Sequence, residues 1–332
     1  CEVMGFELRE DEDTAERIRS YFKSKGGNMP ENNLKQAMLP VGGTVFENNH
    51  GTAPGATLEK NGKCVIILPG PPGELVPMFN ERARGFLKKY SDGAIVSHTV
   101  NIIGMGESSV AEEIEDMFDA KNPTVAPYAK SGEVRLRITA KAETADEADR
   151  MCAPVVDEIC SRLGDVVYGT DMNSIEERVV ALLKEKGKKI ATAESCTAGY
   201  IPKRLTDIPG ASEVFECGIV SYSNDIKTKL LGVSPKTLDT YGAVSEQTAR
   251  EMALGAKHVS GADIAISTTG LAGPGGDGVL PGGLSFAAVT DGERTVVEKI
   301  VTGHENDREY NRYVTASRAL NLARLMLEEK IK

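Results

Sequence analysis

After residue 170, apolar residues recur alternately at helical and at strand spacing. Helical patterns, in which apolar residues return every three to four positions, cover 175–186, 197–205, 246–259 and 308–330. Apolar runs of strand length cover 189–193, 214–221, 262–268, 283–290 and 295–302. Strands that alternate with helices and are followed by an antiparallel pair predict an α/β fold, a three-layer α/β/α sandwich, for residues 171–332.

Residues 94–168 show a second, shorter alternation. The predicted elements are a strand at 95–103, a helix at 108–118, strands at 124–129 and 133–142, a helix at 145–163 and a strand at 165–168. This order predicts a small α+β module. A linker is expected at 169–173, because Ser174 and Glu177 have the spacing of a capping box for the next helix.

Residues 1–92 combine two helical patterns with a region dense in glycine and proline. Helices are predicted at 11–25 and 74–90, and short strands at 43–46 and 64–68. The chain begins with Cys1, and no strand pattern precedes the first helix. We therefore expect part of a longer domain, in which half of a parallel sheet leaves Val65, Ile66 and Ile67 exposed.

Composition and charge narrow the classes of function. The 332 residues are 40% hydrophobic, which is enough for two or three domains with separate cores. The net charge of -10 disfavours nucleic acid and anionic lipid as partners. The loop Gly104-Met105-Gly106-Glu107 carries an acid and few aromatic neighbours, so we expect a spacer there and no nucleic-acid contact. Apolar runs such as 64–68 are far shorter than the roughly 20 residues of a membrane span, which favours a cytoplasmic protein.

Cysteine and histidine are sparse and scattered. The six cysteines form no CxxC pair, and the four histidines are isolated. Neither a disulfide framework nor a metal site is predicted, and reduced thiols fit a cytoplasmic setting. A histidine-dependent serine triad has few candidates, so we expect any catalysis to use another base.

The segment Ala193-Glu194-Ser195-Cys196-Thr197-Ala198-Gly199 lies where a predicted strand ends and a helix begins. Open α/β sheets bind ligands at such junctions, where free helix amides stabilise an anion. Ser195 is therefore a candidate nucleophile that needs a base nearby. Two other interpretations stay open. Ser195 caps the helix, or Cys196 is the nucleophile because the helix N-terminus lowers the pKa of its thiol.

The segment Tyr222-Ser223-Asn224-Asp225-Ile226-Lys227 follows the next predicted strand. A partly desolvated lysine can be neutral near pH 7, so Lys227 is a candidate base for a hydroxyl, with Tyr222 to relay or orient the proton. The alternative is an exposed turn followed by a solvated lysine. Proximity of Lys227 to Ser195 requires that the two strands are neighbours in the sheet.

A glycine-rich segment at 268–278 follows a third strand end. Glycine amides can approach an anion closely, although a flexible hairpin connection has the same composition. We expect the amides of residues 270–276, with the helix start near Thr197, to bind a phosphate group. Three basic residues are unranked candidates to assist them: Arg204, Arg308 and Arg312.

Together these motifs resemble the CinA (competence-damage inducible protein) family. The similarity to its C-terminal domain rests on Ala193 to Thr197, Gly218 with Tyr222 to Lys227, Gly242-Ala243-Val244-Ser245 and Gly270-Leu271-Ala272-Gly273-Pro274. Residues 94–168 resemble the KH-like module of the family. Residues 1–92 resemble the second half of its molybdopterin-binding-like N-terminal domain, through Gly51-Thr52-Ala53-Pro54-Gly55 and Leu68-Pro69-Gly70-Pro71-Pro72. Two positions depart from the family pattern: Ala198, where the family usually has glycine, and Pro281-Gly282-Gly283-Leu284, where Pro-Val-Gly-Thr is common.

The resemblance implies an enzyme of pyridine nucleotide salvage. Stand-alone relatives of the C-terminal domain are nicotinamide mononucleotide deamidases, in which water replaces ammonia at the carboxamide and nicotinate mononucleotide forms. By this resemblance Ser195 is the nucleophile, Lys227 is its base and Tyr222 assists. The implied substrate-binding residues are Cys196, Thr197, Gly199, Asn224, Gly270, Ala272, Gly273 and Gly275.

The resemblance also implies cofactors and partners. The deamidase domain needs no cofactor. A divalent metal belongs only to a complete N-terminal domain that hydrolyses ADP-ribose. We do not expect that activity from residues 1–92. The expected partners are nicotinamide mononucleotide and a second copy in a homodimer, with neither membrane nor nucleic acid. Two alternatives stay open: a non-catalytic nucleotide-binding or regulatory protein associated with competence, and an RNA-binding protein that acts through the middle module.

Overall fold

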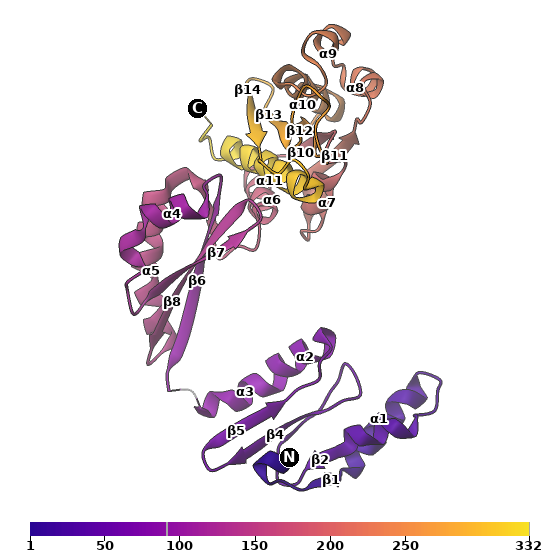
Figure 1. Ribbon diagram of the computed structural model, residues 1–332, viewed down its shortest axis with the longest axis vertical. Helices are drawn as coiled ribbons and strands as arrows, with labels where there is room; N and C mark the ends of the chain where they lie inside the picture. The colour runs from indigo at the N-terminus through magenta and orange to yellow at the C-terminus, as the bar shows by residue number, and fades with distance from the viewer. Residues whose placement is uncertain (91, 332) are drawn as a thin grey trace. The chain divides into compact units, whose positions relative to one another are not determined.

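The computed structural model describes residues 1–90 and 92–331 (Figure 1). The chain forms two compact units, residues 1–92 and 93–332. A further division of the second unit near residue 170 stays a prediction from the sequence. Among the described helices, none has the length and apolar character needed to cross a membrane.

A five-stranded mixed sheet forms the centre of the last part of the chain. Its strand order is β11-β10-β12-β13-β14. The bounds are β10 Ile190–Glu194, β11 Phe215–Val220, β12 Ile264–Gly270, β13 Leu284–Thr290 and β14 Thr295–Val301. β10 is parallel to both β11 and β12, whereas β13 and β14 are added in antiparallel orientation. The carboxyl ends of β11, β10 and β12 therefore meet at one edge of the sheet.

Helices cover both faces of this sheet, which confirms the predicted three-layer sandwich (Figure 1). One layer holds α6 Ile175–Lys186, α7 Tyr200–Thr206 and α11 Arg308–Leu327. The other layer holds α8 Asn224–Leu231, α9 Pro235–Tyr241 and α10 Glu246–Ser260. Side chains alternate along a strand, so Ile190 joins the core shared with α6 and α11, while Ala191 joins the core shared with α10.

One expectation for the segment after β10 is wrong, and the alternative considered for the segment after β11 is excluded. The helix predicted at 197–205 begins only at Tyr200, because Ala198 and Gly199 have φ of 50° and 86°, outside the right-handed helical region. After β11 the chain enters α8, whose N-cap Ser223 accepts a hydrogen bond from the Ile226 amide, and Lys227 is buried and not solvated. Both helices α7 and α8 are short, so their apolar spacing is a weak signal.

The middle module is a four-stranded antiparallel sheet with helices on one face. The strand order is β7-β8-β6-β9, and the bounds are β6 Ala94–Ile103, β7 Thr124–Lys130, β8 Glu133–Ala142 and β9 Val167–Thr170. The helices α4 Glu107–Glu113 and α5 Ala145–Leu163 cover a core that includes Leu136, Ile138 and Ile159. The predicted α+β order is therefore present, with β8 and α5 at their predicted bounds.

The helix that opens the last part of the chain is capped almost as the sequence predicts. The Ser174 side chain accepts a hydrogen bond from the Glu177 amide at 3.3 Å. The Glu177 carboxylate, however, accepts from the Asn173 amide at 2.8 Å, whereas a capping box uses the amide of the cap residue itself. The reciprocal bond is thus displaced by one residue toward the linker.

The strands of residues 1–92 are antiparallel, so the expected half of a parallel sheet is wrong. One sheet pairs β1 Leu8–Glu10 with β2 Met38–Pro40, and the other has the order β3 Val45–Phe46, β4 Gly55–Lys60 and β5 Lys63–Ile67. The helices are α1 Glu12–Ser24, α2 Pro72–Met78 and α3 Arg84–Leu87. Val65 and Ile67 are exposed, whereas Ile66 packs toward Phe46, because neighbouring side chains on β5 point to opposite faces.

Candidate active site

The structure brings Ser195 and Lys227 together at the carboxyl edge of the sheet. Ser195 directly follows β10, and Lys227 lies in the first turn of α8, which follows the neighbouring parallel strand β11. Lys227 Nζ lies 3.0 Å from Ser195 Oγ and donates a hydrogen bond to the Ser221 carbonyl at 2.7 Å. The two strands are therefore neighbours in the sheet, as the proximity of Lys227 to Ser195 requires.

Lys227 is enclosed without a counterion. Its relative exposure is 1%, and within the described part of the chain its ammonium group forms no ion pair. Burial lowers the pKa of Lys227 from its usual value, because the charged form loses its hydration. A buried amine with this partner set is suited to accept the Ser195 proton.

The Ser195 loop excludes the helix-cap interpretation. The N-cap of α7 is Gly199, four residues beyond Ser195, and the Ser195 amide donates instead to the Thr268 carbonyl of β12 at 2.9 Å. Residue Gly199 therefore lies at the helix start, and its place in ligand binding stays a prediction. Thr197 is buried, with its hydroxyl 2.6 Å from that of Thr268.

Cys196 lies beside the Ser195–Lys227 pair, but its environment opposes a thiolate. The side chain is buried, and burial raises the pKa of the Cys196 thiol to about 12. The helix start that could lower this pKa is displaced to Tyr200. A protonated thiol is a weak nucleophile, so the structure favours Ser195 over Cys196.

Ala198 occupies a backbone conformation that favours glycine. Its φ of 50° is left-handed, a conformation that costs a residue with a Cβ atom roughly 1–2 kcal/mol. Glycine avoids this cost, but its greater conformational entropy in the unfolded state offsets part of the gain. Ala198→Gly should therefore raise the free energy of unfolding by up to about 1 kcal/mol. Urea denaturation measures this change. Lower stability of the glycine variant would show that the loop is not strained at this residue.

Tyr222 and Asn224 lie at the surface. The Tyr222 side chain is 62% exposed, and its hydroxyl accepts a hydrogen bond from Arg308 Nη2 at 3.3 Å. Within the described residues it forms no hydrogen bond with Ser195 or Lys227. Asn224 is the exposed first residue of α8.

A cavity of about 190 Å³ is lined by Cys196, the residue after Ser195, and by much of the predicted binding segment. Its lining residues are Cys196, Tyr222, Gly270, Leu271, Ala272, Gly273, Pro274, Gly275, Gly276 and Arg308. Several backbone groups here are already used, since the Gly275 amide donates to the Glu305 carbonyl at 3.0 Å. A Cβ atom at Gly270 would overlap Ser285, so packing against β13 also requires glycine there.

The three candidate arginines separate clearly. Arg204 is buried and binds Glu176 and the Ser317 hydroxyl, each at 2.8 Å, so it belongs to the interior. Arg308 borders the cavity and donates to the Gly273 carbonyl at 2.7 Å. Arg312 donates to the Thr197 carbonyl at 2.7 Å and, with Arg308, borders a neighbouring cavity of about 290 Å³. Of these three candidates, Arg308 and Arg312 therefore border a cavity that a ligand could enter.

Glu194 lies in the segment Ala193 to Gly199, but no role was predicted for it from the sequence. It ends β10 and is fully buried next to Ser195, where its Oε2 accepts a hydrogen bond from the Ile201 amide at 3.2 Å. Burial raises the pKa of Glu194, although the Thr197 hydroxyl and nearby amides oppose the shift. An acidic residue inside a buried central strand is the sequence signal that could have identified it.

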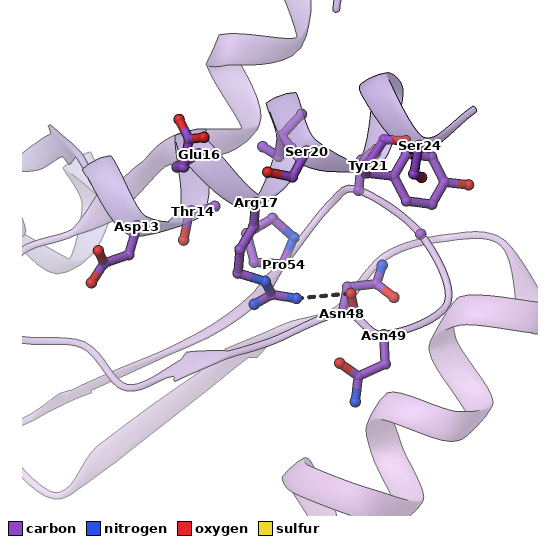
Figure 2. Close-up of a pocket in the computed structure, with 13 residues that line it drawn as sticks. Asp13, Thr14, Glu16, Arg17, Ser20, Tyr21, Ser24, Asn48, Asn49 and Pro54 are labelled. Carbon is purple, nitrogen blue, oxygen red and sulfur yellow. Dashed lines mark hydrogen bonds between the residues drawn. The ribbon is translucent and has the colours of Figure 1, made fainter. Parts of the chain in front are cut away.

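The unit of residues 1–92 has a separate cavity of about 500 Å³ between α1 and the loop at 48–54 (Figure 2). Arg17 crosses it and donates to the Asn48 carbonyl at 3.0 Å, as the dashed line in Figure 2 shows. The Asn48 side chain in turn donates to the Ala53 carbonyl at 2.8 Å and to Glu74 at 2.6 Å. None of the predicted catalytic residues lines this cavity.

The metal expected of a complete N-terminal domain finds no ligand group here. Across residues 1–90 and 92–331, no three His, Cys, Asp or Glu side chains cluster so that they could hold a metal ion. The chemistry proposed below uses the side chains and backbone of the described residues.

Comparison with known proteins covers most of the chain. Residues 172–327 match the family model of the CinA C-terminal domain, and residues 97–169 match that of the damage-inducible protein CinA KH domain. A putative competence-damage inducible protein of Clostridium beijerinckii is 51% identical over 303 residues, which span 90% of this chain and 74% of that protein. A CinA-like protein of Desulfovibrio desulfuricans is 45% identical over 325 residues, which span 97% of this chain and 76% of that protein.

Several solved structures with sequence similarity are also described as competence-damage proteins. The competence/damage inducible protein CihA of Agrobacterium tumefaciens is 38% identical in sequence. The alignment has a TM-score of 0.45 and covers 46% of this chain and 93% of that chain.

Proposed function

The chain belongs to the CinA family, and from this membership and the Ser195–Lys227 contact we propose that its last domain is an amidohydrolase. The proposed substrate is nicotinamide mononucleotide, and the products are nicotinate mononucleotide and ammonia. The contact that supports this proposal is the 3.0 Å separation of Ser195 Oγ from the enclosed Lys227 amine. A buried neutral base beside a strand-end hydroxyl is the arrangement that activates a serine nucleophile.

The reaction proceeds in two steps through an ester. The neutral Lys227 amine takes the Ser195 proton while Oγ forms a bond to the carboxamide carbon. The carbon–nitrogen bond then breaks, and Lys227 returns the proton to the leaving nitrogen, which departs as ammonia. Water, deprotonated by Lys227, attacks the ester carbon. The acid product leaves as Ser195 regains its proton.

The developing negative charge on the carboxamide oxygen needs hydrogen-bond donors. The Cys196 amide follows the nucleophile directly, and in the described part of the chain it makes no backbone hydrogen bond outside the helices and strands. This amide is our proposed oxyanion donor. The proposed ligand contacts extend to Tyr222, Asn224 and the loop at 270–275, with Arg308 and Arg312 facing the phosphate.

Ammonia release tests the proposed substrate. The protein should release ammonia from nicotinamide mononucleotide and much less from nicotinamide or nicotinamide riboside, because both lack the phosphate that Arg308 and Arg312 would bind. A coupled glutamate dehydrogenase assay measures each rate. If the folded protein binds the nucleotide but releases no ammonia, the non-catalytic regulatory alternative is correct. Equal rates with nicotinamide and nicotinamide mononucleotide would contradict the proposed phosphate contact.

A further inference from the structure

Glu194 and Ser195 are consecutive residues that serve opposite faces of the sheet. Glu194 ends the central strand β10 and is 0% exposed. Side chains alternate along the strand, so Glu194 is directed to the layer of α7, whereas Ser195 meets Lys227 of α8. A movement of the Glu194 side chain would therefore be transmitted through one peptide bond to the proposed nucleophile.

The Glu194 carboxyl group closes the loop that carries Ser195. Its Oε2 accepts from the Ile201 amide at 3.2 Å, and the Thr197 hydroxyl and the Gly199 and Tyr200 amides also interact favourably with it. Its Oε1 is buried without a hydrogen-bond partner among the described residues. No cation forms an ion pair with this carboxyl group in the described part of the chain, so its burial is costly for the fold.

The loop between these contacts is strained. Ala198 and Gly199 are both left-handed, with φ of 50° and 86°. Such conformations persist only where the surrounding structure over-determines them. Three hydrogen bonds hold the loop. At its start the Ser195 amide donates to the Thr268 carbonyl, and in its middle the Thr197 and Thr268 hydroxyls pair. At its end the Glu194 carboxyl group accepts from the Ile201 amide.

We propose that Glu194 is a positioning residue, whose carboxyl group holds residues 195–199 so that Ser195 Oγ faces Lys227 and the Cys196 amide faces the reacting carbonyl. This inference rests on the proposed Ser195–Lys227 chemistry. Glu194 acts as a neutral or ionised acceptor for backbone amides and touches neither substrate nor reacting atoms. A buried acid that is retained without an ion pair thereby has a function at the site.

The test uses a readout that does not depend on the substrate. A fluorophosphonate forms a Ser195 Oγ–phosphorus bond with loss of fluoride, so its rate reports serine activation alone. In the full chain, Glu194→Ala should lower this rate and kcat for nicotinamide mononucleotide by about 100-fold, with KM nearly unchanged, because a displacement of about 1 Å has this effect. Glu194→Gln keeps an acceptor oxygen of the same reach and should stay within a few-fold of the original rate.

A double variant separates positioning from a general loss of stability. If Glu194 holds a strained loop, Ala198→Gly lowers the strain and should restore part of the labelling rate lost in Glu194→Ala, by several-fold. Glu176→Ala is the matched control, because it removes another carboxylate of the same domain, paired with Arg204 at 2.8 Å. It should lower Tm and leave the labelling rate within a few-fold.

Each result decides the inference. Unchanged labelling of a folded Glu194→Ala variant, or a Glu194→Gln variant as slow as Glu194→Ala, overturns it. If Glu194→Ala does not fold, Glu194→Met fills the same volume without an acceptor and takes its place. Labelling at Ser195 without ammonia release contradicts the proposed substrate but leaves the positioning role measurable. Absence of labelling in the unaltered protein overturns both the nucleophile and its positioning residue.

Discussion

Replacing Ser195 by alanine should lower kcat for ammonia release by roughly a thousand-fold or more. The hydroxyl is the only reacting group that the variant lacks, and the cavity, the loop at 270–276 and Arg308 stay in place. KM should therefore change little. Steady-state assays with nicotinamide mononucleotide measure kcat and KM, and mass spectrometry of the unaltered protein should detect the acyl-enzyme that the variant cannot form.

The matched control for Ser195 is its neighbour Cys196. Cys196→Ser removes the thiol but keeps the loop amide, so the nucleophilic step should persist and changes should be confined mainly to KM. The raised pKa of the buried thiol, about 12, is the reason. A ranking in which Cys196 is essential and Ser195 dispensable would transfer the nucleophile role to the thiol.

Replacing Lys227 by methionine should lower kcat by a similar factor and yet stabilise the protein. Methionine fills a comparable volume but carries no ionisable group, so its burial does not remove a charge from water. Without its base, Ser195 is inactive, so the double variant Ser195→Ala with Lys227→Met should be no slower than either single variant. Buried functional groups of this kind commonly reduce stability in exchange for activity.

The pH dependence distinguishes this explanation from a simple loss of contacts. Burial lowers the pKa of folded Lys227 below 10.5, so between the two values only the unfolded chain binds the proton. The free energy of unfolding contributed by Lys227 therefore rises with pH across this window. The stability advantage of Lys227→Met should be largest below the folded pKa and should narrow toward pH 10.5.

Activity should follow the same ionisation. The proposed base works only when neutral, so kcat/KM of the unaltered protein should fall as pH drops through the lowered pKa of Lys227. Urea denaturation and ammonia release, each followed over a pH series, measure the two effects. An activity midpoint at the pH where the stability of the unaltered protein begins to rise supports one buried amine in both roles. A methionine variant that is less stable at every pH would contradict the desolvation argument.

Long amphipathic patterns with clear caps were predictable from the sequence. The strand β8 and the helices α5 and α6 have the expected bounds, because each pattern runs for ten residues or more between polar caps such as Thr144 and Ser174. Short elements were not. α8 and α9 contain eight and seven residues, and their start depends on Ser223 and Pro235 rather than on periodicity.

The sequence by itself determined the layered α/β fold and the candidate nucleophile, because strand length, helix period and the residues at a strand end are local properties. Only the tertiary structure decided the rest of the site. Parallel pairing of β10 with β11 brings Lys227 to Ser195. Enclosure by neighbouring elements lowers the pKa of Lys227 and raises the pKa of Cys196. Exposure of Tyr222 and burial of Arg204 were likewise undecided by spacing. Solvent exclusion is produced by segments distant in sequence, and no local pattern encodes it.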